Sequence, residues 1–247
     1  NIYDKFIFIT EDKTSFMKTF SKKNKILCFD HDPDIGGRFS IFSITGILPL
    51  IVLGFPLNKL INCFSIGRDK FVKNHKILSK NILSTLKYED SKNLNILVGL
   101  SYHDRIHAIN EWYRQIFAES LGKNKKAKNY ISAYGSIDQH SQFQLFIDGP
   151  KDKNFTFFKI QNKKTLIKNN QQLIANYNLL SILEKGAIKT LEQKKFLINQ
   201  ITISQNLEEY SYLIIYLIFD IYLRSKVNNI NFLDQPAVEI LKKNTRT

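Results

Sequence analysis

Two stretches of this chain combine side chains that can take up and release protons. In the first, EWYRQIFAESLGK, Glu119 lies four residues after Gln115. If this stretch is helical, the two side chains share one face, and Glu119 lies at the negative end of the helix dipole. A carboxylate at that position is a candidate general base. On the spacing alone, a solvated surface pair is the more common arrangement.

The second stretch, GSIDQHSQFQLFIDGP, surrounds His140 with amide side chains and a carboxylate. It continues from the apolar segment Tyr130–Ser136, which is typical of a strand in a parallel sheet. The turn from such a strand into a helix lies at the carboxyl edge of the sheet, where open α/β folds bind ligands. A helix N-terminus there also offers free backbone N–H groups. His140 is therefore a candidate ligand-contacting residue.

Two further stretches carry weaker signals. In GGRFS, Gly36 and Gly37 would let the backbone approach a ligand closely, and Arg38 could stabilise a developing anion. A Gly-Gly turn beside a surface arginine is, however, common. In DQPAVEILKK, Gln235 and Lys242 are seven residues apart and would share one helix face. An ordinary amphipathic C-terminal helix would give the same spacing.

Apolar and amphipathic segments alternate along the chain in the way that α/β folds with a parallel sheet require. The helix predicted at 39–54 is expected to be buried, with a bend at Pro49. Strands are predicted at residues 5–10, 25–30, 94–102, 130–136, 154–161 and 200–204, and helices at 11–20, 39–54, 57–88 (as two or three helices), 103–122, 171–195, 206–225 and from about 234 onward.

The composition is ordinary for a globular protein, with 43% hydrophobic and 23% charged residues. The 36 basic and 22 acidic side chains give a formal charge of +14, which would suit a nucleic-acid partner. Only six of the basic residues are arginine, the side chain preferred for bidentate recognition of bases and phosphates. The lysines are also spread along the chain. We therefore expect no nucleic-acid partner and attribute the lysines to AT-rich coding.

The two cysteines and the longest apolar stretches indicate neither a metal centre nor a membrane segment. Cys28 and Cys63 lack metal-ligand spacing, and two cysteines do not make a disulfide framework. The apolar stretches at 39–55 and 210–223 are short for a bilayer span and carry polar residues. No signal peptide is visible. We expect a cytoplasmic protein with free thiols.

Taken together and in this order, four stretches resemble the glucose-6-phosphate isomerase (phosphoglucose isomerase) family, in the wording of its shorter bacterial members: DIGGRFSIFSITG, EWYRQIFAESLGK, GSIDQHSQFQLFIDGPKDK and DQPAVEILKK. The resemblance covers the chain from about Phe6 onward. It implies a sugar-isomerase-type (SIS) α/β domain of three αβα layers, in which helices cover both faces of a parallel sheet. The tail of a first such domain would precede it. The implied division is 1–88 for the first-domain remnant and connecting helices, 89–230 for the second domain, and 231–247 for a C-terminal active-site helix.

The resemblance also implies a role for each motif residue. Glu119 matches the base that moves a proton between C1 and C2, and Arg38 matches the arginine that stabilises the cis-enediol(ate). His140 and Lys242 match the groups that assist ring opening, and in the family's dimer the histidine reaches into the partner's site. The residues that match substrate-binding positions are Gln115, Gln235, Gly36 and Gly37.

The implied function is the interconversion of glucose 6-phosphate and fructose 6-phosphate in glycolysis and gluconeogenesis, by an aldose–ketose isomerase that uses no metal or other cofactor. The alternative is a non-catalytic, regulatory sugar-phosphate-binding module on the same fold, but a sensor has no need of a base. The Ser/Thr-rich phosphate loops of the family have no counterpart in this sequence. Thr10–Ser15 has suitable residue types but lies too close to Gly36. We therefore expect this chain to be the carboxyl-terminal part of a longer isomerase.

Overall fold

A computed structural model describes residues 2–161 and 171–245. The chain forms two compact units, Asn1–Ile66 and Gly67–Thr247. The border between these units lies inside one long helix, α3 (Leu57–Ser91). The division at residues 88 and 230 that the family resemblance implies concerns the family's domains and stays a prediction.

The first unit contains two parallel strands, β1 (Ile7–Glu11) and β2 (Leu27–His31), joined by the helix α1 (Phe16–Asn24). Ser15 caps this helix, because its hydroxyl accepts a hydrogen bond from the backbone N–H of Lys18 at 3.2 Å. The two predicted strands are confirmed. The helix begins later than the apolar spacing predicts, since the cap and not the spacing sets its first residue.

The segment after β2 differs from the prediction. The sequence pattern predicts one buried helix at 39–54, but the chain forms a 3-10 helix, η2 (Gly37–Phe42), and then the separate helix α2 (Ile44–Val52). Ser43 causes the break, because its backbone is extended and its hydroxyl accepts from the N–H of Thr45 at 3.3 Å as an N-cap. The expectation of burial is also wrong, since no residue of α2 is buried.

The helix α3 is a single helix of 35 residues, where the sequence pattern predicts two or three. Its polar stretches contain no proline and one glycine, Gly67. A Cβ atom at Gly67 would lie 2.6 Å from Cβ of Ser211, on the helix α8 (Leu207–Asn228). Gly67 therefore allows two helices to pack closely and does not mark a turn.

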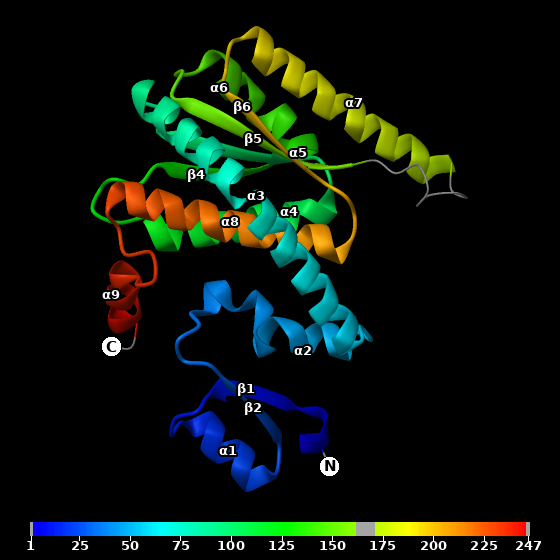
Figure 1. The fold of residues 1–247 in the computed structure, drawn as a ribbon, viewed down its shortest axis with the longest axis vertical. Helices are drawn as coiled ribbons and strands as arrows, with labels where there is room; N and C mark the ends of the chain where they lie inside the picture. Colours follow the sequence, from blue (N-terminus) through cyan, green and yellow to red (C-terminus); the bar gives the residue numbers. More distant parts are fainter. Residues whose placement is uncertain (1, 162–170, 246–247) are drawn as a thin grey trace. The chain divides into compact units, whose positions relative to one another are not determined.

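The second unit contains a four-stranded parallel sheet in the order β4–β3–β5–β6 (Figure 1). Each strand overlaps its predicted segment. The strands are β3 (Ile96–Ser101), β4 (Asn129–Tyr134), β5 (Lys153–Ile160) and β6 (Ile198–Ile203). The helices are α4 (Asp104–Leu121) between β3 and β4, α5 (Gly135–Ser141) and α6 (Phe143–Asp148) between β4 and β5, α7 (Gln171–Gln193) before β6, and α8 after it.

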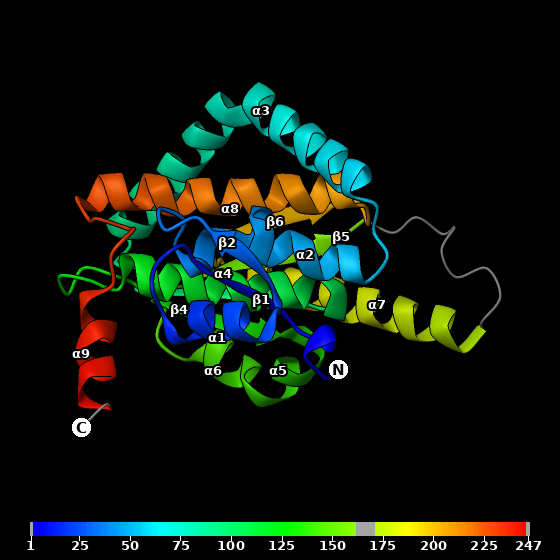
Figure 2. The ribbon, with the colours of Figure 1, turned by 90° about the horizontal axis from the view of Figure 1, so that it is seen from below.

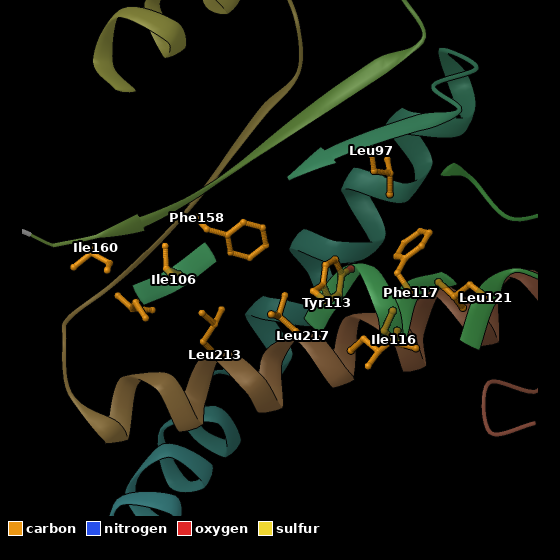
Figure 3. Packing of buried hydrophobic residues seen from close by; sticks show 12 residues of the cluster. Leu97, Ile106, Tyr113, Ile116, Phe117, Leu121, Phe158, Ile160, Leu213 and Leu217 are labelled. Carbon is orange, nitrogen blue, oxygen red and sulfur yellow. The ribbon is translucent and has the colours of Figure 1, made fainter. Parts of the chain in front are cut away.

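Helices cover both faces of this sheet. On one face, Leu97 and Phe158 of the sheet belong to a buried cluster with Phe117 of α4 and Leu217 of α8 (Figure 3). On the other face a second cluster joins the sheet to α6 and α7. Full burial of a large apolar side chain contributes roughly 1.5–3 kcal/mol, so these clusters fix the helices on the sheet. The predicted three-layer α/β architecture is confirmed.

The direction of the chain decides which edge of the sheet each helix end reaches. All four strands run the same way, so the sheet has an amino edge, where the strands begin, and a carboxyl edge, where they end. The helices α4 and α8 follow the carboxyl ends of β3 and β6 and run back, so both end at the amino edge. The helix α9 (Pro236–Asn244) follows α8, and Figures 1 and 2 show it beyond the carboxyl-terminal end of α8.

Two predictions from composition can be compared with the described residues. Cys28 and Cys63 are free thiols, the second of them buried. In the described ranges, 2–161 and 171–245, the helices are too short or too polar to cross a membrane.

Candidate active site

The end of α4 at the amino edge carries Glu119, the predicted base, and Gln115. Gln115 donates a hydrogen bond from Nε2 to Oε1 of Glu119 at 3.0 Å. Gln115 is exposed and Glu119 is half-buried. The other side of the helix packs Ile116 and Phe117 into the core (Figure 3), which fixes the direction of the pair. A carboxylate oriented by an amide one helical turn earlier, at a surface a ligand can reach, suits a proton acceptor.

The amino edge also holds the start of α9. Just after α4 ends, the ammonium group of Lys123 donates hydrogen bonds to the loop between α8 and α9, including the backbone oxygen of Asp234 at 2.6 Å. Gln235 follows directly as the residue that precedes the first turn of α9. Because Lys123 lies one turn beyond Glu119, the structure brings Glu119 and Gln235 to the same edge of the sheet.

Lys242 lies in the last turn of α9. Its ammonium group is 2.7 Å from Oε1 of Glu239, one turn earlier, and its side chain is exposed. No residue of α9 is buried, so the helix presents Lys242 to solvent.

His140 lies at the other edge of the sheet. It belongs to α5, which starts directly after the carboxyl end of β4. The side chains around His140 hold this helix: Asp138 accepts from the backbone N–H of Tyr134 at 2.7 Å, and Tyr102 donates its hydroxyl to Gln139 at 2.9 Å. The imidazole itself is exposed. The neighbouring amide and carboxylate therefore fix the backbone that presents the histidine.

Glu119 and His140 of one chain consequently lie far apart. The helix α4 has 18 residues, which corresponds to about 27 Å of rise. Glu119 is near its end at the amino edge, whereas His140 follows a strand end at the carboxyl edge. The second unit of a single chain does not bring these two side chains to one sugar-sized ligand.

The predicted arginine and glycines belong to the first unit. Arg38 lies in η2, is 9% exposed, and has its guanidinium carbon 5.0 Å from the centre of the Phe39 ring. Gly36 precedes η2 with an ordinary φ of −59°. A Cβ atom at Gly37 would meet no described atom within 4 Å. Neither strain nor packing among the described residues thus requires glycine there, and the convergence of Arg38 with Glu119 stays a prediction.

A buried ion network joins α3 and α8 to the sheet. Arg224 of α8 donates to Asp220 at 2.8 Å and to Glu89 of α3 at 3.0 Å. Lys128 and Asn154 also donate to Glu89, at 3.0 and 2.6 Å. Burial tends to raise the pKa of Glu89, but the positive charges of Arg224 and Lys128 outweigh burial and hold this pKa below its ordinary value. The network ties α3, α8 and β5 together.

Sequence reasoning missed this network and the contacts of Lys123. The network has one local signal in the sequence: Arg224 lies four residues after Asp220 inside an apolar helix. Two side chains at that spacing share a helix face and can be buried together. The contact from Arg224 to Glu89 and the contact from Lys123 to the α9 loop each join residues more than a hundred positions apart. Such contacts leave no short-range pattern.

The four-stranded parallel sheet, covered by helices on both faces, defines an open α/β protein. Comparison with known proteins narrows this class. No protein-family model matches the chain. The chain is 42% identical over 166 residues to glucose-6-phosphate isomerase of Campylobacter jejuni. The aligned region covers 64% of this chain and 39% of that protein.

Two further similarities extend over nearly all of this chain. It is 30% identical over 240 residues to a probable glucose-6-phosphate isomerase of Methanococcus maripaludis, which covers 92% of this chain and 54% of the relative. The crystal structure of a glucose-6-phosphate isomerase from Chlamydia trachomatis matches with a TM-score of 0.74 and 18% identity, over 100% of this chain and 52% of the other. The chain belongs to the glucose-6-phosphate isomerase family, and it spans about half the length of the relatives it matches.

Proposed function

We propose that the protein interconverts glucose 6-phosphate and fructose 6-phosphate through a cis-enediol(ate), with Glu119 as the base that moves a proton between C1 and C2. The observation that carries this proposal is the hydrogen bond from Gln115 to Glu119 at the reachable end of α4, in a chain of the isomerase family. The reaction needs one carboxylate held in a fixed direction, so that it can take the proton from one carbon and return it to the next.

The other motif residues receive the roles that this chemistry requires. Arg38 stabilises the negative charge of the enediolate, and Lys242 and His140 exchange protons with the ring oxygen and the neighbouring hydroxyl group during ring opening. The exposure of both side chains supports this assignment. Gln115, Gln235, Gly36 and Gly37 contact the substrate. For the glycines, the supporting observation is that a Cβ atom placed at Gly37 would have no described atom within 4 Å.

The separation of Glu119 and His140 supports an active site shared between two copies of the chain. Since one copy holds these residues at opposite edges of its sheet, a homodimer in which His140 of each copy reaches the partner's Glu119 would complete two sites at once. We place this dimer in the cytoplasm, in glycolysis and gluconeogenesis.

The substitution Glu119→Gln in the complete gene product tests the assignment of the base. It keeps the size and the hydrogen bonding of the side chain, so the protein should still bind glucose 6-phosphate, while turnover should fall by about a hundredfold or more. Glu111→Gln is the matched control on the same helix, since Glu111 pairs with the exposed Arg114, and it should leave turnover nearly unchanged. Near-normal turnover of Glu119→Gln would show that the base is misassigned. Sugar-phosphate binding by a wild-type protein without turnover would favour the regulatory module.

A further inference from the structure

Lys123 has an unusual environment for a lysine in a surface loop. Its side chain is only 11% exposed. The ammonium group donates to the backbone oxygens of Asn231 and Asp234 and to the carboxylate of Asp234. A lysine ammonium has three protons to donate, so these acceptors use all of them. Burying a charge is costly unless it is fully paired, and here the pairing is complete.

All the acceptors of Lys123 belong to the loop that leads from α8 into α9. This loop begins where Asn229 ends α8 in the left-handed conformation, with φ of 53°. Within it, Phe232 packs edge-on against Tyr222 at a centroid distance of 6.0 Å. The helix α9 has no buried residue of its own. Because no buried side chain anchors α9, the loop that leads into it helps to set its direction, and Lys123 holds this loop at Asn231 and Asp234.

The position of Lys123 in the sequence connects this loop to the base. Lys123 follows the carboxyl end of α4, where a cation is favoured by the helix dipole, and it lies one turn beyond Glu119. Asp234 directly precedes Gln235. The clamp made by Lys123 consequently joins the helix that carries the proposed base to the helix that carries Gln235 and Lys242.

We propose that Lys123 is a positioning residue that fixes the start of α9 against the end of α4 and so keeps Lys242 in place relative to Glu119. This inference rests on the proposed function for its catalytic consequence, but the clamp itself is a statement about structure. Lysine suits the task, because its four-carbon stem spans the gap and its ammonium group binds two carbonyl oxygens and a carboxylate together. The lysine-rich loop 123–128 thus contains a specific structural contact at its first residue.

The first part of the test examines the clamp without reference to activity. In the complete gene product, Lys123→Met keeps the apolar stem and removes the ammonium group. Backbone amides of residues 230–244 should then exchange with deuterated water about tenfold faster, while core strand amides keep their rates. Lys125→Met is the matched control in the same loop, since Lys125 is exposed, and it should leave all rates unchanged. Equal exchange in the Lys123→Met and wild-type proteins would overturn the clamp.

The second part asks whether Lys123 acts through Lys242. Isomerisation of glucose 6-phosphate should fall about tenfold to a hundredfold in Lys123→Met, and Lys125→Met should stay within about twofold of wild type. If Lys123 acts by placing Lys242, the double variant Lys123→Met/Lys242→Met should be no slower than Lys242→Met alone. A general loss of structure would instead make the two effects multiply, and that result would overturn the positioning role.

The two parts separate failure of the inference from failure of the proposed function. If the wild-type protein does not isomerise glucose 6-phosphate, the proposed function is wrong, and with it the catalytic role of Lys123. The exchange measurement still decides whether the clamp exists. If the wild type is active and Lys123→Met is equally active, the proposed function stands and the positioning role is wrong.

Discussion

Arg224 is a buried cation, 7% exposed, that bonds to carboxylates on two different helices. Its partner Glu89 is fully buried and accepts hydrogen bonds from three side chains. Such an arrangement is stable only while every member is present, because an unpaired charge in the core has lost its hydration without compensation.

Replacing Arg224 by methionine should therefore cost about 3–5 kcal/mol in the free energy of unfolding. The apolar stem is kept, but Glu89 and Asp220 lose their shared cation. Urea unfolding measures the effect. Arg114→Met is the matched control, since Arg114 is exposed and pairs with Glu111 at 2.6 Å, and it should cost no more than about 1 kcal/mol. Equal losses for the two variants would contradict the importance of the buried network.

The lowered pKa of Glu89 predicts how the free energy of unfolding depends on pH. The folded-state pKa of Glu89 lies below the ordinary 4.5, so between the two pKa values the unfolded chain binds more protons than the folded protein. The stabilisation by Glu89 is therefore present above about pH 4.5 and is lost as the pH falls through the folded-state pKa. The free energy of unfolding, measured by urea at several pH values between about 6 and 3, should decrease less steeply in Glu89→Gln than in wild type. Glu192→Gln, which alters an exposed residue, should keep the wild-type slope; an unchanged slope in Glu89→Gln would contradict the account.

The sequence could predict contacts between residues that lie close together along the chain, but not contacts between residues that lie far apart. Glu119 and Gln115 lie one turn apart, and the structure joins them directly, so their spacing was sufficient to pair them. Glu89 and Arg224 are 135 positions apart, and in the sequence Glu89 is one of many charged residues of a helix. Its partner becomes visible only when the fold brings α3 and α8 together.

At the scale of elements, the strands were predictable and some helix limits were not. A strand such as Ile96–Ser101 is recognisable because it is apolar on both faces. The limits of helices depend on single capping and packing residues. Ser43 ends one helix and starts another within an apolar run that predicts a single helix. Gly67 looks like a break in α3 but serves close packing against Ser211.

A substitution at Gly135 tests whether close packing against Tyr102 holds α5 in place. Gly135 is the first residue of α5, and a Cβ atom there would lie 2.4 Å from the ring of Tyr102. Gly135→Ala should therefore cost about 1–3 kcal/mol of stability and should also lower turnover, because it displaces the helix that presents His140. Denaturant unfolding and an isomerase assay measure the two effects.

Gly186→Ala is the matched control for this prediction. Gly186 lies inside α7, and a Cβ atom there would meet no described atom within 4 Å. The substitution should raise stability by about 0.5–1 kcal/mol, because alanine loses less backbone entropy in a helix. If Gly135→Ala is as well tolerated as Gly186→Ala, the close approach of α5 to Tyr102 is not what holds the helix.

At the scale of the whole molecule, the proposed site, shared between Glu119 of one copy and His140 of another, predicts how mixtures of two variants behave. Glu119→Gln and His140→Gln proteins should each be nearly inactive. After joint unfolding and refolding, half of the dimers should be mixed, and each mixed dimer should contain one intact site of two. The mixture should therefore recover about a quarter of wild-type activity.

Refolding each variant alone is the control for this mixing experiment and should recover no activity. Absence of recovery in a mixture that demonstrably contains mixed dimers would place Glu119 and His140 of the same copy in one site. It would thereby contradict the shared site.

The central claim is that Glu119 removes the hydrogen on C2 of glucose 6-phosphate, and exchange of that hydrogen tests it most directly. Glucose 6-phosphate should be incubated in deuterated water with the complete gene product and followed by NMR. We predict that the wild-type protein introduces deuterium at C2, that Glu111→Gln does so at a similar rate, and that Glu119→Gln does not. Deuterium incorporation by Glu119→Gln at the wild-type rate, or none by the wild-type protein, would contradict the account.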